Sequence, residues 1–327
     1  MSLSRVSVIA IVLICISNSQ AVQPKGVTVS SEEINPAALL QQADSTFQLH
    51  DYKTALAQYQ AAADRARGEF NRSVEAEALA QMARMHLVLG DKDAGRDWLK
   101  KAESRAVESD PMAWSRYLSV RGRFEWKDND LKSARQTFRD MYAFCTANSL
   151  WGRAVDAANM IAIVAESPAE QIEWGRRGIE TAEANVVESW LGPLWNNLAG
   201  TYFDGKQYDS ALECYLKARE YHWQYSGEVA KLFADYHVGM TCRLLGKYDD
   251  AAKWLRPVLA WAERLDNHSA IGQACEDLGE IEAAQGRTTS ALEFLRRARD
   301  EYKLEGFDQS SPEIWTQINE RIRALEK

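Results

Sequence analysis

Hydrophobic and small residues recur every three or four positions through residues 190–221, WLGPLWNNLAGTYFDGKQYDSALECYLKAREY. Side chains at such spacings share one face of a helix, and small residues on that face let two helices approach closely. A polar interval around Gly205 separates the two stripes. The pattern therefore predicts two amphipathic helices that pack as a hairpin and need similar neighbours to cover their apolar faces.

The same pattern repeats along the chain with a period close to 40 residues. One column of the repeat holds Ala55, Gly95, Ala134, Gln171, Ala211, Ala251 and Ala291. A second column, in the preceding helix, holds Ala43, Ala83, Gly122, Ala199, Gly239 and Gly279. These columns predict seven helical hairpins over residues 37–306. The fourth unit departs from them because Gln171 and Asn159 replace small residues, which leaves its register open by one or two residues.

The repeat resembles the tetratricopeptide repeat family. The positions in residues 190–221 that match the family pattern are Trp195, Leu198, Ala199, Tyr202, Tyr208, Ala211, Tyr215 and Ala218. The units exceed the usual length of about 34 residues, lack the terminal proline and displace the turn glycine by one position, to Gly205. Units of this length look like the extended repeats of kinesin light chain and of the sensor in the maltose-regulon activator. The resemblance implies an all-α, right-handed solenoid of antiparallel helix pairs whose first helices line a concave face.

The N-terminal residues have the pattern of an export signal. Residues 1–21 combine Arg5, an apolar run from Val6 to Ile16 and small residues before a cleavage point after Ala21. The run is shorter than the roughly 20 residues that a membrane-spanning helix needs, so an uncleaved anchor is the less favoured alternative. We therefore expect a periplasmic or secreted protein that begins with a flexible leader at residues 22–36.

The C-terminal residues 307–327 predict a capping helix. Ser311 and Pro312 are expected to end one helix and begin another. Apolar residues then recur on one side of the new helix, at Ile314, Ile318, Ile322 and Leu325. A repeat array needs such a helix to cover its open end.

Charge and cysteine content limit the possible partners and cross-links. The net charge is −8 and contains no basic block, and removal of Arg5 with the signal takes it to −9. Nucleic acid is therefore not expected as a partner. Four cysteines remain after cleavage, without a C-x-x-C motif, at Cys145, Cys214, Cys242 and Cys275. Buried free thiols are favoured, although a Cys214–Cys242 disulfide stays open.

The sequence contains no catalytic or cofactor-binding motif. The five histidines are scattered, none belongs to H-E-x-x-H or to a zinc cluster, and G-x-S-x-G, P-loop and G-x-G-x-x-G patterns are absent. We therefore expect no catalytic residue, no cofactor, no metal site and no enzymatic activity.

The family resemblance also indicates a binding surface. In tetratricopeptide arrays, three positions of each first helix face the groove, and the corresponding columns give the candidate partner-binding residues Arg84, Arg123, Trp126, Asn196, Phe203, Tyr236 and Arg243. They do not reproduce the Lys and Asn pattern of the chaperone-binding carboxylate clamp. The main hypothesis is an exported protein-protein interaction scaffold that binds an extended peptide or a partner helix in the concave groove. The alternative is a sensor or carrier for a small anionic or aromatic ligand, with Arg84, Arg123 and Arg243 supplying charge.

Overall fold

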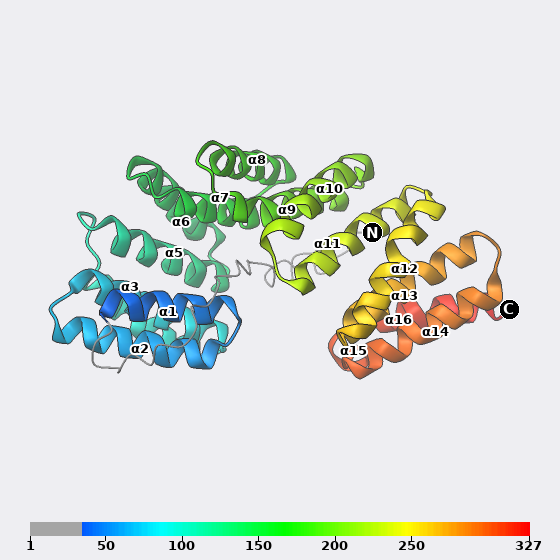
Figure 1. Cartoon of the computed structure of the whole chain (residues 1–327), viewed down its shortest axis with the longest axis horizontal. Helices are drawn as coiled ribbons and strands as arrows, with labels where there is room; N and C mark the ends of the chain where they lie inside the picture. The colour runs from blue at the N-terminus through cyan, green and yellow to red at the C-terminus, as the bar shows by residue number, and fades with distance from the viewer. Residues whose placement is uncertain (1–34) are drawn as a thin grey trace. The chain divides into compact units, whose positions relative to one another are not determined.

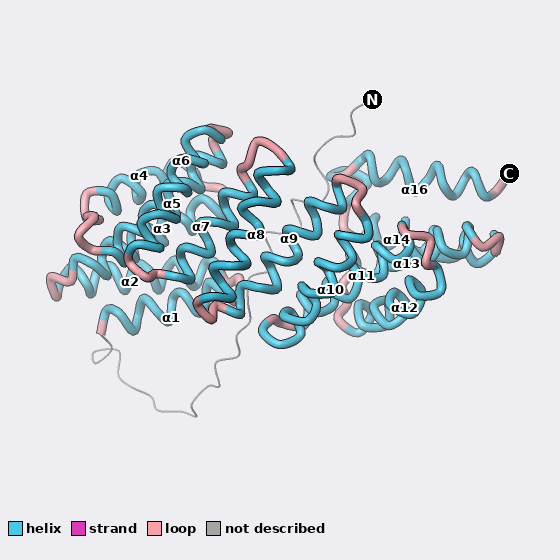
Figure 2. The backbone as a smooth tube through the Cα atoms, turned by 90° about the horizontal axis from the view of Figure 1, so that it is seen from above, coloured by secondary structure: helices cyan, strands magenta, loops and turns pink. Residues whose placement is uncertain are grey.

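A computed structural model describes residues 35–327 of the chain, and throughout this range the chain forms helices joined by short turns (Figures 1 and 2). No strand occurs among these residues. The expected signal peptide and the leader up to residue 34 lie outside the described range. No helix of residues 35–327 combines the length and the apolar character that crossing a membrane requires.

The described helices follow one another in seven pairs, each with a first and a second helix. The pairs are α1 (Pro36–Gln48) with α2 (Tyr52–Gly68), α3 (Arg72–Val88) with α4 (Lys92–Glu103), α5 (Pro111–Lys127) with α6 (Leu131–Ala147), α7 (Trp151–Ile163) with α8 (Pro168–Ala184), α9 (Leu191–Asp204) with α10 (Tyr208–Tyr225), α11 (Glu228–Leu244) with α12 (Tyr248–Arg264), and α13 (His268–Ala284) with α14 (Thr288–Leu304). The short 3-10 helix η2 (Glu188–Trp190) precedes α9. The predicted fold class, an all-α solenoid of helix pairs, is confirmed.

The described residues form two compact units. The N-terminal unit comprises residues 35–194, and the C-terminal unit comprises residues 195–327, so that α9 begins in one and ends in the other. In the N-terminal unit, a continuous apolar core extends from Leu40 to Trp174. In the C-terminal unit, α15 (Phe307–Ser310) follows α14, and α16 (Pro312–Leu325) packs against α14 and buries Ile318 and Ile322.

Local sequence explains where the helices start. The cap residues Asn35, Asp51, Asn71, Asp91, Asp110, Asp130, Ser167 and Asn267 accept a hydrogen bond from the backbone N–H three residues later. Such caps satisfy an N–H that has no partner inside the helix. In several pairs, the residue before the cap of the second helix has a left-handed backbone conformation, with positive φ. In three pairs this residue is a glycine, namely Gly90, Gly246 or Gly286. In the fifth pair Lys206 takes this conformation, with φ of 57°, because its glycine stands one position earlier at Gly205.

The close-contact column keeps one place in all seven pairs. Its members are each the fourth residue of a second helix; the five alanines are 0% exposed, Gly95 is also buried, and Gln171 is half-buried. Gln171 has this place in α8, where Ser167 caps the helix and Pro168 is its first residue, so the register that the sequence left open is now defined. The small-residue column of the first helices is packed as closely. A Cβ added at Gly122 of α5 would lie 2.6 Å from the Phe138 ring of α6. Small residues are therefore needed where the two helices of a pair cross, except in the fourth pair, where Gln171 takes this place.

The four cysteines of the described range are buried, and none of them forms a disulfide. Cys214 and Cys242, the pair that the sequence left open, do not form a disulfide in this structure. Buried thiols of this kind pack as small apolar side chains, and burial raises the pKa of Cys145 and Cys275 to about 12. These thiols are held in the unreactive protonated form at neutral pH.

Candidate functional site

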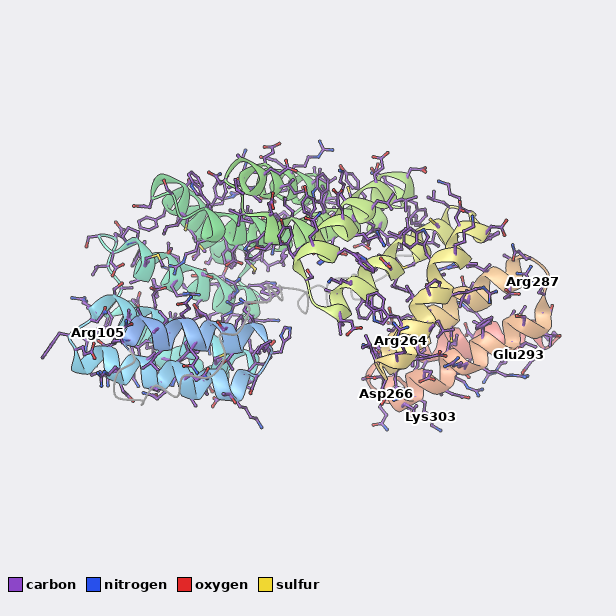
Figure 3. The ribbon with its side chains drawn as sticks, viewed as in Figure 1. Arg105, Arg264, Asp266, Arg287, Glu293 and Lys303 are labelled. Carbon is purple, nitrogen blue, oxygen red and sulfur yellow. The ribbon has the colours of Figure 1, made fainter. Side chains whose placement is uncertain are left out.

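Charged side chains are buried on the first helices of the N-terminal unit. The surface formed by α1, α3, α5 and α7 is called here the N-terminal first-helix face. Most other charges are exposed, such as Arg105 in this unit and Arg287, Glu293 and Lys303 in the C-terminal unit (Figure 3). A buried charge requires a partner because transfer from water is costly. The pairings on the first-helix face therefore define what this surface can still bind.

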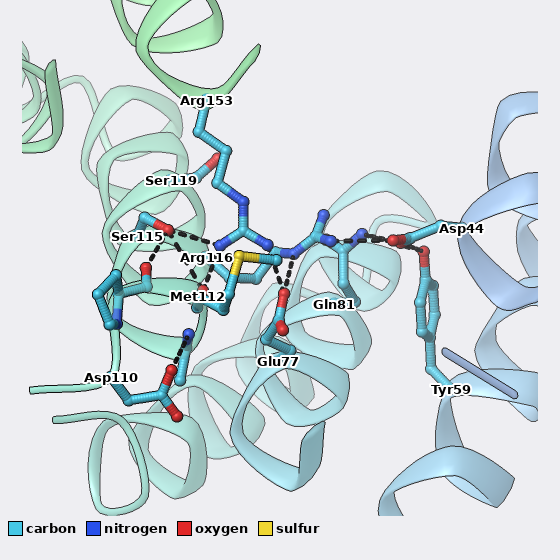
Figure 4. Close-up of polar contacts among 12 residues, drawn as sticks. Asp44, Tyr59, Glu77, Gln81, Asp110, Met112, Ser115, Arg116, Ser119 and Arg153 are labelled. Atoms are coloured by element: carbon cyan, nitrogen blue, oxygen red, sulfur yellow. Dashed lines mark hydrogen bonds and ion pairs between the residues drawn. The ribbon is translucent and has the colours of Figure 1, made fainter. Parts of the chain in front are cut away.

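Asp44 of α1 collects three hydrogen bonds at one end of this face (Figure 4). Its oxygens accept from the Tyr59 hydroxyl at 2.6 Å, from Gln81 Nε2 at 2.9 Å and from Arg116 Nη2 at 2.9 Å. Burial alone would raise the pKa of Asp44, but Arg116 and the hydrogen bonds hold that pKa below its usual value. Asp44 is therefore ionised at neutral pH and compensated by Arg116.

Glu77 of α3 joins two arginines from other helices (Figure 4). Its Oε2 accepts from Arg116 Nε of α5 at 3.3 Å and from Arg153 Nη2 of α7. Arg153 also donates to the Ser115 hydroxyl at 2.5 Å and to the carbonyl of Met112. The network from Asp44 to Arg153 therefore crosses all four first helices of the unit and fixes their side chains.

Arg123 and Asp156 form a second buried pair beside this network. Arg123 of α5 is only 9% exposed, and its Nη2 donates to both carboxylate oxygens of Asp156 on α7, at 2.8 and 3.1 Å. Its Nη1 donates to the carbonyl of Ser119 at 2.9 Å. Burial acts to raise the pKa of Asp156, yet the Arg123 guanidinium keeps it below the usual value. The charge of Arg123 is thus used inside the protein.

Arg84 of α3 differs from these arginines because it has no carboxylate partner. Within residues 35–327 it makes no ion pair and no hydrogen bond, and its guanidinium carbon lies 4.5 Å from the centre of the Phe47 ring of α1. The side chain is half-buried. Burial, and then the nearby Arg123, lower the pKa of Arg84 to about 10. The nearby Asp156 carboxylate acts in the opposite direction, so Arg84 is a partly desolvated cation with charges of both signs around it.

The C-terminal unit has its own polar cluster on α11 and α13. Arg243 of α11 donates to Asp277 and, at 2.5 Å, to Glu280, both on α13. Arg321 of α16 pairs with Glu280 at 2.9 Å and also with Glu276. Burial raises the pKa of Asp277 to about 6, against the opposing effect of Arg243. The charge of Arg243, like that of Arg123, is used in internal pairs.

The candidate residues from the sequence fall into two groups, one in each unit. Arg84 and Arg123 lie close together in the N-terminal unit, where Trp126 is half-buried with the Lys127 ammonium 4.5 Å from its ring. Four others lie in the C-terminal unit, namely Asn196, Phe203, Tyr236 and Arg243. Their role in partner binding stays a prediction.

The four residues of the C-terminal group have partners inside their unit. Asn196 Oδ1 lies 3.0 Å from His237 Nδ1, and the Phe203 ring centre lies 5.4 Å from that of Tyr208. Tyr236 is 8% exposed. Asn196, Phe203 and Arg243 nevertheless remain partly exposed, so Tyr236 is the one residue of this group that offers little surface to a partner.

Sequence reasoning missed several residues of the buried network: Glu77, Arg116, Arg153 and Asp156. A signal for two of them was present. Glu77 stands seven residues before Arg84 on α3, and Arg116 stands seven residues before Arg123 on α5. Seven residues are two helical turns, so each pair lies on one side of its helix. Glu77 and Arg116 could therefore have been found by looking two helical turns before Arg84 and Arg123 on the same side of each helix.

Asp277→Asn is expected to reduce the pH dependence of the C-terminal unit's stability. The carboxyl group titrates at about 6 in the folded chain, compared with 3.8 for an ordinary aspartate. The folded state therefore binds this proton more tightly, so the stabilising contribution is present below the unfolded pKa and is lost as pH rises through about 6. The variant should gain stability relative to the parent between pH 4.5 and 7.5, as measured by urea unfolding. The exposed substitution Asp300→Asn serves as the control, and an equal difference at both pH values would contradict the expectation.

Comparison with protein families gives a consistent match. Three segments, residues 40–111, 192–220 and 232–303, match family models described as tetratricopeptide repeats. Together they span just over half of the chain. A sequence relative is tetratricopeptide repeat protein 29 of Macaca fascicularis, which is 24% identical over 128 residues. This match covers 38% of the chain and 27% of the relative.

Solved structures with the same fold include a signal transduction ATPase and two Rap proteins. The tetratricopeptide-sensor protein of the signal transduction ATPases with numerous domains from Pyrococcus horikoshii superposes with a TM-score of 0.69 at 14% identity, over 86% of this chain and 44% of that one. The apo form of RapI gives 0.66 at 15% identity, over 82% and 76%. A Rap protein complexed with competence and sporulation factor gives 0.56 at 15% identity, over 89% and 87%. This chain thus spans less than half of the first of these proteins, and the likeness concerns the fold.

Proposed function

This chain belongs to the tetratricopeptide repeat family, and we propose that it is an exported, non-catalytic scaffold that holds an extended segment of a partner protein against its first helices. The observation that carries the proposal is the N-terminal first-helix face. Its buried side chains are fixed by hydrogen bonds across four helices, while Phe47, Arg84 and Trp126 remain partly exposed. A surface ordered before binding loses less entropy when a partner docks.

The accessible residues of this face are of the types that usually dominate binding. Aromatic and arginine side chains contribute most when they become buried at the centre of an interface. Trp126, Phe47 and Arg84 provide two aromatic rings and one cation on neighbouring first helices. Export rests on the pattern of residues 1–21. A non-catalytic role rests on the family and on the absence of a catalytic motif in the sequence.

Site-specific photo-crosslinking tests this function. A benzoylphenylalanine placed at Trp126 or Phe203 probes first helices, and the same group at the exposed positions Lys132 or Leu216 probes second helices of the same units. The protein is expressed in a secreting host and crosslinked in the exported fraction, where its intact mass should correspond to a start at Val22. Crosslinks to one partner from the first-helix positions alone are expected. Crosslinks from Lys132 and Leu216 alone would reject the first-helix face as the binding surface.

The alternative, a carrier or sensor for a small ligand, is favoured by the unpaired charge of Arg84. A half-buried cation beside an aromatic ring can hold a small anion as well as a side chain of a peptide. A thermal-shift screen with small carboxylates on the same protein separates the two functions. Stabilisation by a metabolite without any crosslinked partner would select the carrier.

A further inference from the structure

We propose that the indole rings of Trp223 and Trp261 form a platform that binds an uncharged oligosaccharide. Trp223 belongs to α10 and Trp261 to α12, so both rings come from second helices of the C-terminal unit. The platform shares no residue with the N-terminal first-helix face, and it adds a second kind of ligand to the proposed scaffold. Its test is therefore independent of the partner segment.

Trp223 exposes more of its surface than any other tryptophan of this chain. All eleven tryptophans lie within the described residues, and Trp223 is 43% exposed, while the others are half-buried or buried. Leu216, which stands seven residues earlier on α10, is 44% exposed. Seven residues are two helical turns, so both side chains lie on one side of the helix. Apolar side chains that gather at the surface, unlike scattered ones, often mark a site of interaction.

Hydrogen bonds hold the two indole rings in place. Trp223 Nε1 donates to Asp235 Oδ1 of α11 at 2.9 Å, and Trp261 Nε1 donates to Glu228 Oε1 of the same helix at 2.8 Å. The two ring centres lie 5.8 Å apart, with an angle of 57° between the ring planes. Because the rings are ordered before binding, a ligand that stacks on them loses little free energy to side-chain ordering.

The charged groups around the rings compensate one another. Arg219 Nε donates to Asp235 at 2.6 Å, and its guanidinium carbon lies 5.0 Å from the centre of the Trp223 ring. Lys231 Nζ lies 6.0 Å from the centre of the same ring. Two cations, Arg219 and Lys231, therefore stand beside two carboxylates, Asp235 and Glu228. Balanced charge favours an uncharged ligand over an acidic or a basic one.

A sugar ring has the two kinds of surface that this platform can contact. A pyranose with equatorial hydroxyl groups presents C–H bonds on its faces and hydroxyls around its edge. The C–H bonds can lie against an indole ring, whose face is electrically negative. The hydroxyls both donate and accept hydrogen bonds, so they can pair with the cations and with the carboxylates beside the rings. Two adjacent rings could hold two consecutive sugars of a chain.

A helix of a partner protein fits this surface less well. Docking of an amphipathic helix uses a continuous apolar strip. Here Glu220 lies on the same side of α10 as Leu216 and Trp223, between them, and it is paired with the exposed Lys217 at 3.5 Å. The apolar surface is therefore divided into patches of the size of a ring, which suits stacked sugars better than a helix.

The test measures the binding of uncharged oligosaccharides to the full chain. Cellotetraose and chitotetraose, two chains of β-linked pyranoses, are titrated by calorimetry against the parent, Trp223→Ala, Trp223→Phe and the control Phe70→Ala. We expect Trp223→Ala to weaken binding at least tenfold and Trp223→Phe to weaken it less, since a phenyl ring keeps a face for stacking. Phe70→Ala should leave binding unchanged, because Phe70 is 94% exposed and lies in the other unit. No binding of either sugar to the parent, or equal binding to Trp223→Ala and to the parent, would overturn the proposal.

Three further measurements distinguish other occupants of this surface. Hydroxyl-radical footprinting of the parent, which needs no substitution, should show that bound sugar protects Trp223 and Trp261 from oxidation; protection of Trp126 instead would place the sugar on the first-helix face and reject the platform. Oligogalacturonate that binds more tightly than cellotetraose would contradict an uncharged ligand. A dimer of the parent that Trp223→Ala converts to a monomer would assign the surface to a second copy of this chain and overturn the sugar site.

Discussion

Replacing Arg123 by glutamine is expected to lower the free energy of unfolding of the N-terminal unit by about 3–5 kcal/mol. The substitution removes the cation that faces Asp156, and it leaves that carboxylate buried without compensation. Urea unfolding followed by hydrogen exchange in α5 and α7 measures the loss. The exposed neighbour Arg121, changed to glutamine on the same helix, should cost less than about 0.5 kcal/mol.

A second variant identifies the cause of the Arg123 effect. Asp156→Asn combined with Arg123→Gln removes both charges and should recover most of the lost stability, because no buried ion is left unpaired. A double variant as unstable as the single one would show that packing of the Arg123 side chain, and not its charge, stabilises the contact between α5 and α7.

Phe138→Ala is expected to destabilise the third helix pair by about 3–5 kcal/mol. The ring is 0% exposed and fills the space above Gly122, where an added Cβ would lie 2.6 Å from it. Gly122→Val alone should also destabilise, by about 1–3 kcal/mol, because it forces the two helices apart. Calorimetry or urea unfolding can measure both.

The two substitutions should not add. In the Phe138→Ala protein the Gly122→Val side chain enters the space that the ring has left, so the double variant should be more stable than the sum of the single effects predicts. Phe70→Ala is the matched control, since Phe70 is 94% exposed. Additive losses would mean that Gly122 and Phe138 do not share the contact.

The helix pairs could be predicted because their signals are local. An apolar stripe, a small residue at the fourth position of every second helix except α8, and in many helices a side-chain cap are all encoded within one unit. The fourth pair shows how far this extends, since Ser167 and Pro168 give the start of α8 although Gln171 breaks the column. Lys206 shows where prediction from local sequence fails. The left-handed position belongs to the turn geometry, and the glycine beside it in the sequence does not take it.

The state of each candidate residue could not be predicted because it depends on neighbouring helices. Arg84 and Arg123 occupy the same column of the repeat, yet only Arg123 has a carboxylate partner. Asp156 of α7 forms an ion pair with Arg123, whereas Arg84 forms none, and Arg123 and Asp156 shift its pKa in opposite directions. Tyr236 belongs to a column that the family pattern assigns to the groove, but it is 8% exposed here. A column of the repeat therefore predicts where on the helix a residue lies, but it does not predict how much of its side chain is exposed.

The buried network of the N-terminal unit extends the range of cooperativity in the array. Repeat proteins usually couple only adjacent repeats, so that unfolding proceeds inward from an end one repeat at a time. Here Asp44 of the first pair bonds to Arg116 of the third, and Glu77 of the second pair bonds to Arg153 of the fourth. Unfolding of the first pair would remove the Asp44 carboxylate from Arg116, which lies two repeats further along the chain. The first four pairs should consequently unfold as one block, with a sharper transition than a chain of nearest neighbours would show.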